Sequence, residues 1–72
     1  MTKFLPVQKL LRLYPNAPVD GYDVIDAAEA LAKFLRCSRV DIIGKALESE
    51  HSAKLLLKFA ERRRDSALLQ SV

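Results

Sequence analysis

Cys37 and His51 are the residues of this sequence whose side chains most often perform catalysis or bind metals, and they are its only cysteine and its only histidine. Arg36 and Arg39 stand close to Cys37 and favour the reactive thiolate form, although a cysteine at a helix corner is more often a small buried apolar residue. His51 falls in the expected start of a helix, where a surface role is the common one. Nucleophilic catalysis needs a base beside the nucleophile, and zinc needs several soft ligands. We therefore expect no catalytic residue, no metal site, no cofactor and no small-molecule substrate, and a protein that is not an enzyme.

The composition is that of one small domain. At 72 residues, of which 50% are apolar and 29% charged, the chain is apolar enough to fold and too short to form two cores. Two glycines are too few for a glycine-rich phosphate loop, and one cysteine cannot form an internal disulfide. No apolar run approaches the roughly 20 residues that a membrane-spanning helix needs, and the N-terminus lacks a signal-peptide pattern. We expect a single domain over residues 1–72, located in the cytoplasm.

Apolar spacing and cap residues predict two helices in the first half of the chain. A short helix is expected over residues 6–13, where a proline suits the first turn and apolar residues recur at helical spacing. A loop with two prolines and a glycine follows. The second helix is predicted from about Gly21 to Arg36, because Asp20 can cap its free N–H groups. Its expected inward stripe, widened by Phe34, consists of Val24, Ala27, Ala28, Leu31 and Leu35.

Two further helices are predicted in the second half. Ser38 offers an N-cap, and Asp41 follows it three positions later as in a capping box, so a third helix should begin there. Gly44 inside this helix predicts either close packing or a local break. The fourth helix should begin within residues 49–52, with an uncertain N-cap, and reach about Leu69.

The residue pattern of the fourth helix predicts where packing onto the core ends. Its inward stripe of Leu56, Phe59 and Ala60 leads one turn later to Arg63, and arginine is seldom buried without a partner. Packing should therefore fade near Glu61. We predict a compact all-α domain of three or four helices, with a core over about residues 5–61 and a C-terminal helix that continues as a basic and apolar extension over residues 62–72. The shared core is expected to be Val24, Leu31, Leu35, Ile43, Leu47, Leu56 and Phe59.

The tight connection between the second and third helices raises the alternative of a dimeric helix-turn-helix regulator that binds DNA. The motif calls for a small residue, two apolar residues, a cap and a further apolar residue, and these positions hold Ala32, Leu35, Cys37, Ser38 and Ile42. Arg36 and Lys45 do not fit, because the motif usually has a glycine and an inward residue there. The outward polar residues of the third helix also carry more negative than positive charge, which would repel phosphate. They are Asp41, Lys45 and Glu48.

The basic residues fit two alternative interpretations: a surface that contacts a partner, or a surface that is only solvated. The chain has 12 Lys and Arg against 9 Asp and Glu, a formal net charge of +3. Pairs at i, i+4 spacing account for part of the charge, namely Glu29–Lys33, Asp41–Lys45 and Glu50–Lys54. If the chain contacts nucleic acid, which we consider the less favoured possibility, the candidate residues are Lys3, Lys9, Arg12, Arg36, Arg39 and Lys45.

Apolar residues left over from the predicted core are the most informative feature. On the last helix Leu57 and Leu68 share a face outside the inward stripe, and exposed apolar rows usually mark a partner surface. The alternative is that a loop or the first helix covers Leu57. The predicted partner-binding residues are Leu57, Arg62, Arg63, Arg64, Leu68 and Leu69. We thus expect a small regulatory or adaptor protein that binds another protein or a second copy of itself, of the kind that phages or plasmids use to modulate a host machine such as transcription or defence enzymes.

Overall fold

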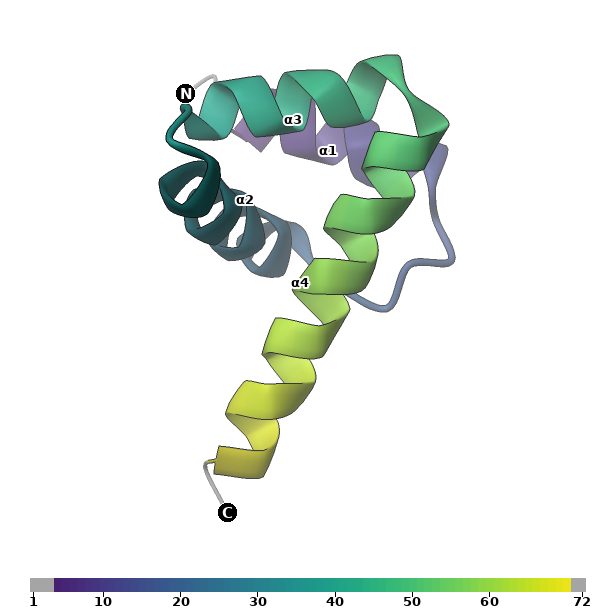
Figure 1. Cartoon of the computed structure of the whole chain (residues 1–72). Coiled ribbons are helices and arrows are strands. Elements are labelled where there is room, and N and C mark those ends of the chain that lie inside the picture. The colour runs from purple at the N-terminus through teal and green to yellow at the C-terminus, as the bar shows by residue number, and fades with distance from the viewer. Residues whose placement is uncertain (1–3, 71–72) are drawn as a thin grey trace.

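The chain folds into four α helices around a small apolar core. The computed structural model describes residues 4–70, and within this range it has helices and no strand: α1 (Phe4–Leu13), α2 (Gly21–Leu35), α3 (Arg39–Glu48) and α4 (Glu50–Gln70). Figure 1 shows α3 lying alongside α1, with α4 crossing the domain and continuing past the other helices. At 21 residues, α4 is about 31 Å long. The predicted all-α fold with an extended C-terminal helix is confirmed.

The starts of α2 and α3 are fixed by the residues that the sequence indicated. The Asp20 side chain accepts a 2.9 Å hydrogen bond from the Asp23 backbone N–H, and the Asp23 side chain accepts one from the backbone of Asp20. Ser38 and Asp41 form the same reciprocal box at the start of α3. Each box satisfies backbone donors that the first helical turn leaves unpaired. Both predicted caps are confirmed.

The corner between α2 and α3 depends on one residue with an unusual backbone conformation. Arg36 has φ 59° and ψ 44°, in the left-handed region, and its N–H donates to the Ala32 carbonyl. The Cys37 N–H donates to the same carbonyl at 2.9 Å. Glycine usually occupies this position because its lack of a Cβ removes the steric cost. Helix α2 therefore ends at Leu35, one residue before the predicted end.

Ser49 serves both α3 and α4, which explains why the start of α4 was difficult to predict. Its backbone N–H donates to the Lys45 carbonyl at the end of α3, while its carbonyl accepts from the Ala53 N–H at 2.9 Å. Its hydroxyl also accepts from the Ser52 N–H at 3.4 Å. One residue thus closes one helix and begins the next, so the two helices meet without a loop.

The core is built from all four helices and contains several alanines. Of the predicted core, Val24, Ile43 and Leu56 are buried, while Leu31, Leu47 and Phe59 are partly buried and pack against it. Small side chains let neighbouring helices approach closely, and they fill much of the interface. The buried set is Val7, Leu10, Val24, Ala27, Ala28, Ala32, Ile43, Ala46, Ala53, Leu56, Leu57 and Ala60.

Two predictions about leucines are wrong. Leu35, expected in the core, is 57% exposed, because it is the last residue of α2 and the chain turns away to α3 directly after it. Leu57, expected on a partner surface, is only 7% exposed and belongs to the core. The loop that joins α1 to α2 lies against that side of α4, where Tyr14 and Ala17 line a hollow together with Leu57. The alternative that a loop covers Leu57 is therefore the correct one.

Gly44 follows neither of its two predicted roles. Helix α3 runs through it without a break, and a Cβ built on Gly44 would meet no atom within 4 Å. Val40 on the same helix is also largely exposed. The side of α3 that carries Val40 and Gly44 is thus largely uncovered.

Beyond Ala60, the last buried residue of α4, arginine side chains rather than apolar ones hold the helix to the domain. Arg63 pairs with Asp26 of α2, and an Arg64 guanidinium nitrogen donates to the Pro18 carbonyl. Apolar packing does end near Glu61, as expected, while the helix continues past the other helices without a break. It remains regular to Gln70.

Candidate functional site

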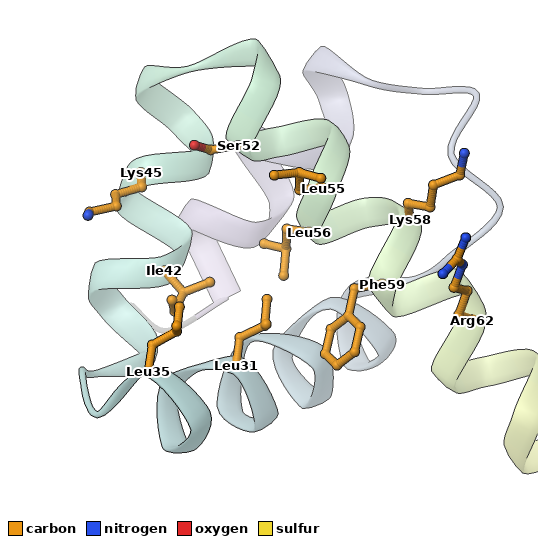
Figure 2. Close-up of a pocket in the computed structure, with 10 residues that line it drawn as sticks. All are labelled: Leu31, Leu35, Ile42, Lys45, Ser52, Leu55, Leu56, Lys58, Phe59 and Arg62. Carbon is orange, nitrogen blue, oxygen red and sulfur yellow. The ribbon is translucent and has the colours of Figure 1, made fainter.

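An open apolar groove of about 500 Å³ lies where α2, α3 and α4 meet. Its volume is within the range of roughly 300–1,000 Å³ that is typical of ligand pockets. Apolar side chains from all three helices make up most of its lining, and Figure 2 shows them arranged around the hollow. These residues are Leu31, Leu35, Ile42, Leu55, Leu56 and Phe59.

Helical spacing places these side chains on one surface. Leu31 and Leu35 are one turn apart on α2, and Leu55 and Phe59 are one turn apart on α4, so each pair projects from one side of its helix. Leu56 is almost fully buried and joins the groove to the core. By contrast, Leu35 is 57% exposed and Leu55 is 58% exposed. The groove therefore presents two large leucines to solvent.

The apolar surface continues around the corner between α2 and α3. A second hollow shares Leu35, Ile42 and Lys45 with the groove and adds Cys37 and Val40. Val40 is 72% exposed, and Cys37 is exposed and free. Single exposed apolar residues are normal, whereas a continuous group on adjoining helices indicates a contact surface.

Positive charge accompanies the apolar lining. Lys45 of α3 and Lys58 and Arg62 of α4 line the groove, and Figure 2 shows Lys45 on the α3 side and the other two on the α4 side. Among the described residues, none of the three is in an ion pair, and no Asp or Glu lines this groove. The acidic residues near it, Asp41 and Glu48, line the second hollow instead.

Four other cations of the chain have partners within the fold: Arg39, Lys54, Arg63 and Arg64. Arg39 pairs with Glu29 of α2 rather than Glu29 with Lys33, and Lys54 pairs with Glu50 at 3.4 Å as its spacing predicted. Arg64 binds the Asp65 carboxylate at 3.2 Å, and its buried Nε has no hydrogen-bond partner. Lys45, Lys58 and Arg62 differ from these paired cations, and Lys9, Arg12, Lys33 and Arg36, outside the groove, are likewise in no ion pair with a described residue.

The predicted partner-binding residues do not form one surface. Leu57 is in the core, while Arg63 and Arg64 bind groups of their own domain. Leu68 and Leu69 are exposed near the end of α4, away from the groove. From this set, only Arg62 lines the groove.

The predicted nucleic-acid residues that the structure describes are spread over two helices and a corner. Lys9 and Arg12 lie exposed on α1, Arg36 is in the left-handed corner, and Lys3 lies outside the described residues. Arg39 is bound to Glu29, and Lys45 belongs to the groove.

The burial of the helix-turn-helix positions agrees only in part with what that motif requires. Ala32 is buried, Ser38 is the cap, and Ile42 is partly buried, as that motif requires. Leu35 and Cys37, which the motif would pack between its helices, are exposed. The space that this packing would fill is part of the groove.

Cys37 and His51 lie on different elements of the fold. Both are exposed, Cys37 at the corner after α2 and His51 in the first turn of α4. Within residues 4–70, no group of three or more His, Cys, Asp or Glu side chains is arranged to hold a metal ion. None of the helices described combines the length and the apolar character needed to span a bilayer.

Sequence reasoning missed the groove for an identifiable reason. Leu31, Leu35 and Phe59 were assigned to the core on the basis of each helix alone. A stripe on one helix does not reveal whether its neighbours close over it. The signal that could have revealed it is that the apolar stripes of α2 and α4 are together wider than the surface that the two helices bury against each other.

Comparison with known proteins adds no assignment, since the chain matches no protein-family model, no curated protein and no solved structure.

Proposed function

We propose that this chain is a small non-enzymatic adaptor or regulatory protein that acts by binding another protein in the groove between α2, α3 and α4. The observation that carries the proposal is the pair Leu35 and Leu55, each more than half exposed on the sides of one apolar hollow. Burying such side chains against a partner releases roughly 25 cal/mol for each Å² of apolar area removed from water. A well-packed interface centred on them would supply a substantial driving force.

The arrangement also resembles the usual anatomy of a protein interface. Such interfaces have an apolar centre, with aromatic residues and arginine enriched, surrounded by a polar rim. Phe59 and the leucines provide the centre here, while Arg62 and Lys58 lie at the edge. The long stems of these cations can cover apolar surface while their charges remain in water.

DNA binding by the α2–α3 corner is the second candidate, and the Ser38 cap and buried Ala32 are the observations that favour it. The exposed side of α3 argues against it, because it combines Val40 with two acidic residues, Asp41 and Glu48, and only one cation, Lys45. Binding through phosphate contacts falls steeply as salt rises, whereas an apolar contact persists. Salt dependence therefore separates the two candidates.

The test is affinity capture from a lysate of the native host with the immobilised full chain, at low and high salt. We expect a protein that is retained at high salt and lost with Leu55→Glu, because a carboxylate in the groove opposes apolar docking. Leu69→Glu is the matched control, since Leu69 is 77% exposed on the same helix outside the groove.

Three outcomes would contradict the proposal. Equal retention of the captured protein by Leu55→Glu and by the parent chain would exclude the groove as its binding site. Loss with Leu69→Glu alone would place the contact at the end of α4. Recovery of nucleic acid that is released by salt would favour the DNA-binding candidate.

A further inference from the structure

We propose that the occupant of the groove is an amphipathic α helix of a partner protein, with apolar anchors on one face and Asp or Glu beside them. This inference rests on the proposed function, because it names the chemistry of the partner that the same groove would bind. It follows from three features of the groove: the charge of its rim, the lack of backbone partners and the spacing of its leucines.

The positive charge at the edge of the groove favours a partner with acidic residues. Lys45, Lys58 and Arg62 line the groove without an ion pair to any described residue, and the described lining has no carboxylate. A partner carboxylate would meet these cations from two sides of the groove, since Figure 2 shows Lys45 and Arg62 on different helices. A basic partner would be repelled, and the formal net charge of +3 adds to this preference over longer distances.

The secondary structure of the lining selects a helix rather than an extended peptide. Helices make up the whole lining, so their backbone N–H and C=O groups are already bonded within each helix. An extended segment would bury its own backbone polar groups here without partners, which is costly. A helix satisfies its backbone internally and needs only side-chain contacts from the groove. Helix-in-groove recognition works in this way, through apolar anchors at i, i+3, i+4 and i+7.

The spacing of the leucines suits such anchors. Leu31 and Leu35 on α2, and Leu55 and Phe59 on α4, are each one turn apart, which is about 5.4 Å along a helix axis. A partner helix packed along either row would repeat its anchors with the same period. Ile42 and Leu56 would lie beneath them.

A second copy of the chain is a poorer occupant. Its acidic residues along α2 are partly used inside its own fold, since Asp26 pairs with Arg63 and Glu29 with Arg39. Two copies would also repel one another through their equal positive charge. We therefore assign the groove to a different protein.

The experiment uses two synthetic peptides that share one apolar face, with leucines at i, i+3, i+4 and i+7, and that are cross-linked so that both are helical. One peptide has Glu at the positions flanking the leucines and the other has Lys. Binding to the full chain is measured by fluorescence anisotropy of the labelled peptides at several salt concentrations. We expect the Glu peptide to bind about tenfold more tightly at low salt, with the difference shrinking as salt screens the charges.

Charge variants locate the effect. The double variant Lys58→Gln and Arg62→Gln should weaken binding of the Glu peptide about fivefold, as two exposed ion pairs would. The control double variant Lys9→Gln and Arg12→Gln removes the same charge from α1, outside the groove, and should leave binding nearly unchanged. Leu55→Glu should weaken binding of both peptides.

Several outcomes would overturn the inference. Equal binding of the two peptides, or tighter binding of the Lys peptide, would exclude an acidic partner. If the two double variants weaken binding of the Glu peptide equally, the preference for that peptide comes from the overall charge of the chain and not from the groove. Sedimentation that shows a dimer disrupted by Leu55→Glu would assign the groove to a second copy. If neither peptide binds but a lysate protein is captured in a way that depends on Leu55, the partner is not such a helix and the proposed function stands. If neither peptide binds and capture is also unchanged by Leu55→Glu, both proposals are wrong.

Discussion

The Nε atom of Arg63 donates a 2.8 Å hydrogen bond to Oδ2 of Asp26, which joins α4 to α2 one turn beyond the last buried residue of α4. The same guanidinium lies 5.7 Å from the centroid of the Phe59 ring. Arginine on the inward stripe predicted that packing would fade near Glu61. The long side chain instead reaches a carboxylate at the rim, so its charge is paired without being buried.

The Arg63–Asp26 pair should contribute little to global stability and more to local order. Both side chains are substantially exposed, so solvent screening limits their coupling to about 0.2–1 kcal/mol. A double-mutant cycle of Arg63→Met and Asp26→Asn, measured by urea unfolding, gives this energy. Amide hydrogen exchange over residues 61–68 should be faster in either single variant. Unchanged exchange there would show that the pair does not hold the end of α4.

Leu55 and Leu56 are neighbours of identical chemistry with opposite environments, and they should respond very differently to truncation. Leu56 is 2% exposed, so Leu56→Ala should cost about 2–5 kcal/mol, which approaches the whole stability of so small a domain. Leu55→Ala, at the exposed edge of the groove, should cost less than about 1 kcal/mol. Thermal unfolding followed by circular dichroism measures both. Similar losses for the two variants would mean that the groove is closed in solution.

Gly44→Ala should stabilise the protein by about 0.5–1 kcal/mol. Glycine within a helix is less favourable than alanine by this amount, and the added Cβ has open space around it. Ala46→Gly on the same helix is the reverse control and should destabilise, since Ala46 is buried in the core. A lower melting temperature for Gly44→Ala would show that another group approaches this side of α3.

Arg36→Gly should also raise the melting temperature. Arg36 has a positive φ, which costs a residue with a Cβ roughly 1–2 kcal/mol, and this cost exceeds the extra chain entropy of glycine. Lys33→Gly, three residues earlier within α2, should lower stability by about 1 kcal/mol because the helix is regular there. If Arg36→Gly proved less stable than the parent chain, the arginine side chain would have a stabilising contact that outweighs its backbone cost.

The sequence alone determined the elements of this protein. Asp20 and Ser38 marked two helix starts because a cap acts on backbone groups only a few residues away. The all-α class followed from apolar spacing, which is also a local property. Arg36 occupies the site where a glycine is usual, and its left-handed conformation could not be inferred from its residue type.

The tertiary structure decided which apolar residues are covered. Leu35 and Leu57 each follow the helical pattern of their own segment, yet one is exposed and the other buried. Leu57 is buried because a loop more than 35 residues away in sequence lies against α4, and Leu35 is exposed because α3 turns away from it. Burial depends on such distant neighbours, whose positions no local pattern encodes. For the same reason the groove, which needs three helices to form it, emerged only when they were placed together.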